Sequence, residues 1–144
     1  MRECRCTPQQ VARYRDRLSG PLRDRLDLTV EVPALPAEVL AETTRGESSA
    51  AVRVRVEAAR ARQAARYRAD GFRTNAEMTP VLMTKYCALD GRGQRLLTAA
   101  VTRLALSARA YDRVRKVART VADLAGDESV AADHLGEALQ FRMH

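Results

Sequence analysis

The sequence has no tryptophan, and aromatic residues make up only 4% of its 144 positions. Glycine and proline are scarce as well, with seven and five residues, and lysine occurs only at Lys85 and Lys116. A core without large aromatic side chains must be built from small aliphatic ones, and apolar residues still make up 46% of the chain. This composition is typical of closely packed helices and predicts a mainly α fold.

Motifs for catalysis, metal binding and membrane insertion are also missing. No glycine stands in a GxxxxGK[ST] phosphate loop, and no Ser, His, Asp or Cys spacing suggests nucleophilic catalysis, so we expect the chain alone to be inactive. Cys4 and Cys6 are half of a zinc site, and His134 with Glu137 supplies two ligands, so no metal is expected. Without a signal peptide or a spanning apolar run, we expect a soluble, cytoplasmic protein.

Basic residues outnumber acidic ones. Lys and Arg total 25 against 18 Asp and Glu, so the net charge is 25 − 18 = +7 and the pI is near 10.0. Polyanions such as DNA or nucleotide phosphates are natural partners for such a chain. A high arginine content can also reflect the amino-acid composition of the whole genome and not a binding surface. Five arginines of the segment 46–71 form either a DNA-phosphate stripe or a solvated helix face: Arg53, Arg55, Arg60, Arg62 and Arg66.

The length suits one domain, and residues 1–33 read as the end of a larger one. Thr7 and Pro8 predict a helix start, and a short helix is expected over Pro21–Leu26. Leu28–Val32 alternates apolar and polar residues and predicts a strand. A lone strand must pair with something outside the chain or lie as an exposed edge.

A linker over residues 34–46, with a possible short helix at Glu38–Thr43, separates this segment from a helical bundle. Helices are predicted over 46–71, 80–89 and 93–106. The buried positions expected in these helices are Val52, Val56, Ala59, Cys87, Leu96, Leu97, Ala100, Val101 and Leu104, and Asn75 is a turn or cap residue.

A long amphipathic helix is predicted to begin at an N-cap, Ser107, and to end at Gly126. Its expected buried stripe is Tyr111, Val114, Ala118, Val121 and Ala125, and its expected outward residues are Asp112, Lys116, Arg119 and Asp123. Arg109 stands out because a cation in the first turn opposes the helix dipole. It either faces a phosphate or is a solvated surface arginine.

Three phrases, CRCTPQQVARYRDRLSGPLRDRLDLTVEVP, GESSAAVRVRVEAARARQ and LSARAYDRVRKVARTVADL, resemble the C-terminal part of the magnesium-chelatase-like AAA+ ATPases of the competence protein ComM (YifB) type. The resemblance implies a truncated core end with an arginine-finger segment over 1–33 and a C-terminal helical lid over 47–144. It also implies a hexameric ring that binds ATP and Mg²⁺ and drives DNA branch migration.

By the same resemblance, Arg25 in GPLRDRLD matches the arginine finger, which reaches the ATP of a neighbouring subunit. Arg109 in LSARAYDR matches the sensor-2 arginine, which contacts the nucleotide of its own subunit. Arg23 stands where the family usually has leucine, so it competes for the finger role. The phosphate loop and the Mg-binding acid would come from an AAA+ core encoded elsewhere or lost. The alternatives are a free-standing basic module that binds nucleic acid and a non-functional remnant.

Overall fold

The computed structural model describes residues 5–36 and 46–142, and within these ranges the chain is helical and contains no strand. The α-helices are α1 (Pro8–Arg15), α2 (Gly20–Arg23), α4 (Ser49–Arg66), α5 (Pro80–Tyr86), α6 (Gly91–Leu104), α7 (Ala108–Ala125) and α8 (Ala132–Gln140), with a short 3-10 helix, η1 (Asn75–Glu77), before α5. The mainly α class is therefore confirmed. No helix in the described part is long and apolar enough to cross a membrane.

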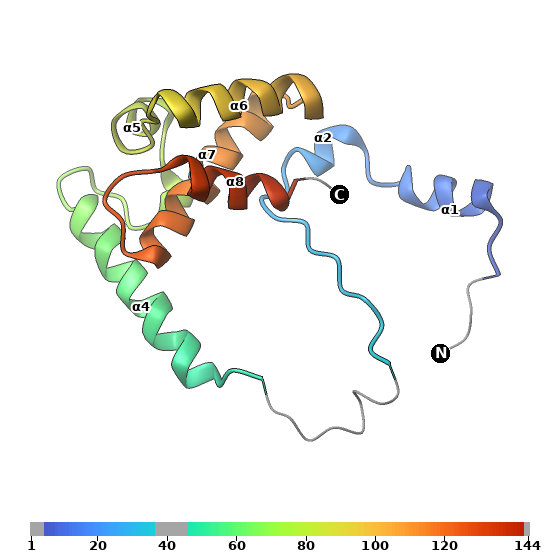
Figure 1. Cartoon of the computed structure of the whole chain (residues 1–144), viewed down its shortest axis with the longest axis horizontal. Coiled ribbons are helices and arrows are strands. Elements are labelled where there is room, and N and C mark those ends of the chain that lie inside the picture. The colour runs from blue at the N-terminus through green and yellow to red at the C-terminus, as the bar shows by residue number, and fades with distance from the viewer. Residues whose placement is uncertain (1–4, 37–45, 143–144) are drawn as a thin grey trace.

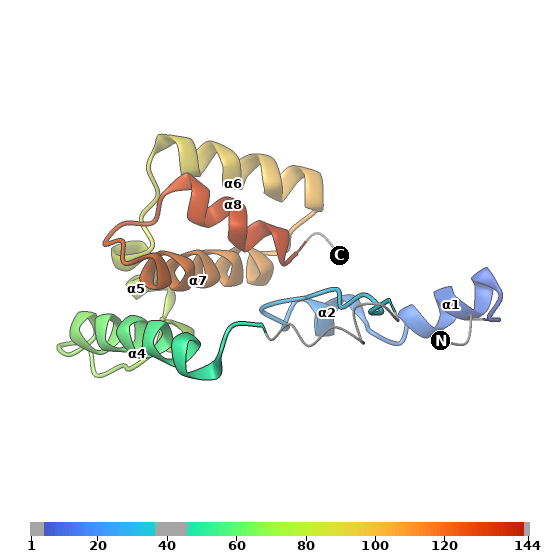
Figure 2. The same cartoon turned by 60° about the horizontal axis from the view of Figure 1, so that its bottom comes forward.

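Two regions differ in shape. Residues 46–142 form a bundle, whereas residues 5–36, which we call the arm, extend away from it with α1 at the far end (Figure 1). Figure 2 shows α7 between α4 on one side and α6 with α8 on the other. Because α7 also contacts α5 and η1, it is the central helix of the bundle.

Hydroxyl side chains fix where most helices begin. Thr7 starts α1 in a capping box with Gln10, and Ser48, Thr79 and Ser107 accept first-turn N–H groups of α4, α5 and α7. At the other end of α7, Gly126 adopts a φ of 91°, which is the left-handed conformation that glycine permits. The helix limits predicted at Thr7, Ser107 and Gly126 are confirmed, and of the two serines that can cap the helix of 46–71, Ser48 and Ser49, the structure uses Ser48.

Two apolar clusters stabilise the bundle. The larger joins α6, α7 and α8 around fully buried residues such as Leu97 and Leu135, and the smaller surrounds Tyr67, Met83 and Cys87. The predicted burial of Ala59, Leu97, Ala100 and Cys87 is confirmed, as is that of Val114 and Ala118 on α7.

Several predicted orientations are wrong. Val52 and Val56 are exposed, because the first half of α4 extends beyond the helices it contacts, and Leu96, Leu104 and Ala125 are exposed too. Arg119 and Asp123 were expected to point outward, yet they are 1% and 0% exposed, because α7 is covered on more than one side.

The predicted strand Leu28–Val32 is also wrong. The segment is extended and its apolar side chains are exposed, and its one backbone bond to the bundle runs from Thr29 N–H to the Phe141 carbonyl at 3.0 Å. The short helix expected over Pro21–Leu26 is present as α2, which ends earlier, at Arg23. The helix expected over Glu38–Thr43 lies outside the described residues.

Candidate functional site

Arg109 lies at the second position of α7, in a turn whose N–H groups carry the positive end of the helix dipole. Ser107 accepts the Ala110 N–H at 3.2 Å, and no acidic residue occurs in this first turn. Within the described part of the chain, Arg109 is exposed and has no hydrogen bond or ion pair. Among the described residues, therefore, no hydrogen bond or ion pair of the Arg109 side chain relieves the predicted conflict between its charge and the helix dipole.

A cleft of about 590 Å³ opens beside Arg109. Arg109, Arg113 and Lys116 follow each other along one side of α7 and line it, while Met78, Met83 and Val117 give it apolar surface. Asp27 and Leu28 of the arm form part of the opposite lining. Asp112 adds a second carboxylate to the lining, so the cleft combines three cations, two carboxylates and apolar surface.

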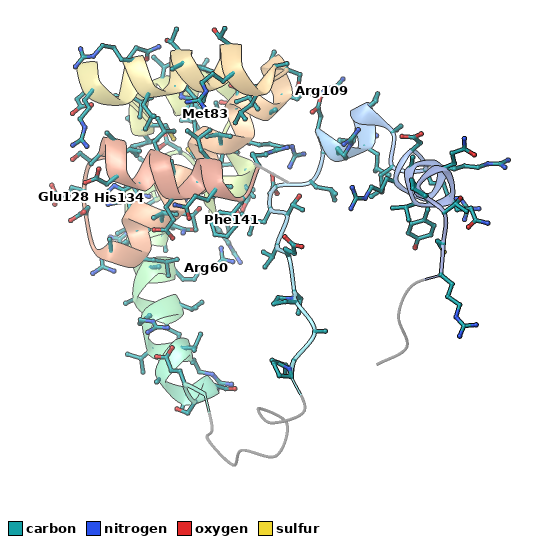
Figure 3. All side chains as sticks on the ribbon, turned by 45° about the vertical axis from the view of Figure 1, so that its right-hand side comes forward. Arg60, Met83, Arg109, Glu128, His134 and Phe141 are labelled. Atoms are coloured by element: carbon teal, nitrogen blue, oxygen red, sulfur yellow. The ribbon has the colours of Figure 1, made fainter. Side chains whose placement is uncertain are left out.

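Two of the three cations are already paired inside the chain. Arg113 forms an ion pair with Asp27, and the Lys116 Nζ donates to the Ala76 carbonyl at 2.8 Å. Among the described residues that line the cleft, Arg109 is therefore the cation whose charge is available to a ligand. Figure 3 places it at the end of the bundle that faces α2.

Arg25 lies in the turn after α2, where its backbone N–H donates to the Leu22 carbonyl at 3.0 Å, and its exposed side chain has no partner among the described residues. Arg23 is exposed as well, and its carbonyl accepts a bond from Arg142 at 3.4 Å. Arg25 does not line the cleft of Arg109, so the structure does not bring the two predicted site arginines into one pocket. Arg25 and Arg109 are thus exposed at separate places on the structure.

The five arginines of α4 do not form one open stripe. Arg55 makes two bonds of 2.7 Å to Glu47, and Arg60 donates to Gln63 at 3.4 Å. Arg62 donates to the Asp123 carbonyl at 3.1 Å. Arg66 pairs with the Asp123 carboxylate, so in the described residues only Arg53 of this set lacks a partner.

Asp123 is the centre of a buried polar network that the hydrophobic pattern did not reveal. Its carboxylate accepts from Arg66, from Arg119 at 3.1 Å and from the Asn75 amide at 2.9 Å. Burial alone would raise the pKa of Asp123, but bonds from Arg66 and Asn75 and the nearby arginine charges outweigh it and hold this pKa below its usual value. The network joins α4, η1 and α7, and its Asn75 also lines the cleft beside Arg109.

The cysteine and histidine residues show no metal site. Cys6 is exposed and Cys87 is buried, and Cys4 lies outside the described residues. His134 accepts the Ala131 N–H at 3.1 Å and lies 3.0 Å from Asp127, so it caps α8. No group of three or more metal-ligating side chains occurs in residues 5–36 and 46–142.

Comparison with known proteins establishes the class. Residues 46–142 match the family described as magnesium chelatase, subunit ChlI C-terminal, and residues 1–40 match the family described as magnesium chelatase, subunit ChlI. The chain therefore belongs to the magnesium chelatase ChlI family. Within it, the chain corresponds to the C-terminal region of ComM/YifB-type proteins, and the resemblance noted in the sequence is confirmed.

The individual relatives agree with one another. The chain is 43% identical to the competence protein ComM of Haemophilus influenzae over 139 residues, which is 96% of the chain and 26% of that protein. It is 42% identical to the uncharacterized protein YifB of Salmonella typhimurium and 41% to the uncharacterized protein Rv2897c of Mycobacterium tuberculosis, covering 27% and 28% of each. The chain thus spans about a quarter of the length of these curated relatives.

Proposed function

We propose that this chain supplies the lid helices and the arginine-finger segment of a ComM-type AAA+ ATPase that uses ATP and Mg²⁺ to move DNA branches. Arg109 binds the nucleotide of its own subunit, and Arg25 reaches the nucleotide of a neighbour in a hexameric ring. The phosphate loop and the Mg²⁺-binding acid belong to the ATPase core and are not among residues 1–144, so these residues alone hydrolyse no ATP.

The observation that carries this proposal is the state of Arg109. It lies in a helix first turn beside a cleft, is exposed, and has no anionic partner in the described part of the chain. A phosphate group is the ligand that relieves such a conflict, because it accepts from a guanidinium and is attracted to a helix N-terminus. The separate, unpaired position of Arg25 suits action on a second nucleotide.

The proposal is tested by joining this chain to a phosphate-loop core. In a chimera, the chain replaces the matching region of the Haemophilus influenzae ComM protein, with which it shares 43% identity. We expect the chimera to hydrolyse ATP and to move a four-way DNA junction, and the chain alone to do neither.

Two substitutions in the chimera separate the two roles. Arg25→Ala should lower kcat by at least about 100-fold while nucleotide still binds, because arginine fingers stabilise the charge of the transition state. Arg109→Ala should weaken nucleotide binding measurably. Arg103→Ala, an exposed arginine in the last turn of α6, is the matched control and should change neither. Hydrolysis by the chain alone, or full activity of Arg25→Ala, would contradict the proposal.

DNA binding by the α4 arginines is the second candidate, and the geometry supports it less. Four of the five side chains are engaged within the chain, which leaves Arg53 as the open member. A salt-dependent shift of DNA by the purified chain that Arg53→Ala weakens and Arg109→Ala does not would favour this role.

A further inference from the structure

The turn that carries Arg25 is attached to the bundle on both sides. Before it, the Arg23 carbonyl accepts a bond from Arg142. After it, Asp27 pairs with Arg113, and the Thr29 N–H donates to the Phe141 carbonyl at 3.0 Å. Figure 3 shows Phe141 at the end of α8, beside the extended part of the arm.

The partner of Asp27 lies on the helix that carries Arg109. Arg113 is one helical turn beyond Arg109, and both residues line the same cleft. Asp27 and Leu28 line the cleft from the arm. One ion pair therefore links the segment of Arg25 to the helix of Arg109, and a movement of the arm changes the lining beside Arg109.

The charge of Asp27 acts on Arg142 as well as on its ion-pair partner Arg113. The pKa of Arg142 is lowered first by burial and then by the charge of Arg113, whereas Asp24 and Asp27 raise it. The Nε and Nη2 atoms of Arg142 are buried without a hydrogen-bond partner in the described part of the chain. If the negative charge of Asp27 is removed, less of the repulsion between Arg113 and Arg142 is compensated. The arm also loses the ion pair that attaches it to α7.

We propose that Asp27 is a positioning residue that couples the two nucleotide sites of one subunit by tying the Arg25 turn to the Arg109 helix through Arg113. This inference rests on the proposed function, because it assigns a coupling to the two arginines named there. Exposed ion pairs are individually weak, so the contact can form and release as nucleotide comes and goes. A change at one site thereby changes the other site's affinity, and the coupling is reciprocal.

The first test uses the full chain itself and measures hydrogen exchange. Asp27→Asn should speed exchange of the Thr29 amide at least about threefold, since a docked segment opens more often when one attachment is lost. The amides in the middle of α7 should keep their rates. Asp112→Asn is the matched control, because it removes the same charge from the lining of the same cleft at a carboxylate without a partner among the described residues.

The second test measures coupling in the ComM chimera. Asp27→Asn and Arg113→Ala should reduce the Hill coefficient of ATP hydrolysis toward one, while Arg113→Lys, which keeps the charge, should restore part of it. The charge-swapped double variant Asp27→Arg with Arg113→Asp is not used as a test, because the new positive charge at position 27 would repel Arg142. Asp16→Asn, at an exposed carboxylate of the arm that does not line the cleft, should keep the wild-type Hill coefficient.

The outcomes separate the two proposals. Unchanged exchange in Asp27→Asn, or an unchanged Hill coefficient with faster exchange, overturns the coupling while the roles of Arg25 and Arg109 stand. Full ATP hydrolysis by the Arg25→Ala chimera overturns the proposed function, and the coupling between the sites is then overturned with it, even if the exchange result holds.

Discussion

The arm and the bundle are built from similar residues but differ in what those residues contact. In residues 5–36 no side chain is buried, and Val30 and Val32 are 64% and 85% exposed. Residues 46–142 contain two apolar clusters and a buried charge network. The bundle is therefore stabilised by its own buried contacts, whereas the arm has apolar side chains and makes too few contacts to bury them.

The exposed apolar side chains of the arm follow each other closely along the chain. They are Leu18, Leu22, Leu26, Leu28, Val30, Val32 and Leu35. Such a concentration marks a surface that another body covers. In the proposed assembly that body is the ATPase core, and the extended segment from Leu28 is where the core would meet it.

The largest expected effect concerns the buried network of the bundle. Asp123→Ala should lower the free energy of unfolding by about 3–5 kcal/mol at pH 7, because Arg66 and Arg119 would remain buried without their carboxylate. Urea denaturation followed by circular dichroism measures this loss. Asp16→Ala in the arm, an exposed carboxylate, should change the value by less than about 0.5 kcal/mol.

The stabilisation that the Asp123 carboxylate provides should depend on pH. The folded pKa of Asp123 is lowered, so its contribution is fully present above the unfolded-state pKa, near 4, and is lost as pH falls through the folded value. The difference in stability between the wild type and Asp123→Asn should therefore shrink below pH 4. A difference that grows in acid would show that the carboxylate does not stabilise the fold through its charge.

The next largest effect on stability is expected for a leucine substitution in the bundle, and the same substitution in the arm tests the comparison between the two regions. Leu135→Ala removes a fully buried side chain of α8 and should cost about 2–5 kcal/mol. Leu28→Ala removes an arm side chain that is 51% exposed and should cost less than about 0.5 kcal/mol. Equal losses in the two variants would mean that the arm is part of the folding unit.

The smallest change, in reactivity rather than stability, concerns two thiols. Burial raises the pKa of Cys87 to about 11, so at pH 8 only about 0.1% of it is thiolate. In a Cys4→Ser variant, Ellman's reagent should label Cys6 in the arm quickly and Cys87 only after unfolding in guanidinium. Rapid labelling of two thiols in the folded Cys4→Ser variant would contradict the closed cluster around Cys87.

Local chemistry explains which parts of the fold were predictable. The hydroxyl caps at Thr7, Ser48 and Ser107 and the glycine at 126 act on neighbouring backbone groups, so the sequence alone locates them. The unpaired first-turn position of Arg109 was predictable for the same reason. These features need no knowledge of what packs against the helix.

Contacts between distant residues were not predictable. A single apolar stripe assumes that one side of a helix is covered, but α7 is covered by α4 as well as by α8, so its charged positions Arg119 and Asp123 became interior. Their compensation comes from Arg66, which is 57 residues from Asp123 along the chain. Val52 and Val56 show the opposite error, because they were predicted to be buried and are exposed. An apolar helix face is buried only where another helix packs against it, and the first half of α4 extends past its neighbouring helices.

The two ends of α7 also differ in how firmly they are fixed. At the C-terminal end, Arg119 donates to the carbonyls of Asp127 and Glu128, and Arg62 lies against Gly126. The N-terminal end opens onto the cleft. An 18-residue helix is about 27 Å long, so a rotation of about 5° at the fixed end displaces the Arg109 end by about 2 Å. If Arg109 binds a nucleotide as proposed, a tilt of α7 of this size would make or break its contact with a phosphate.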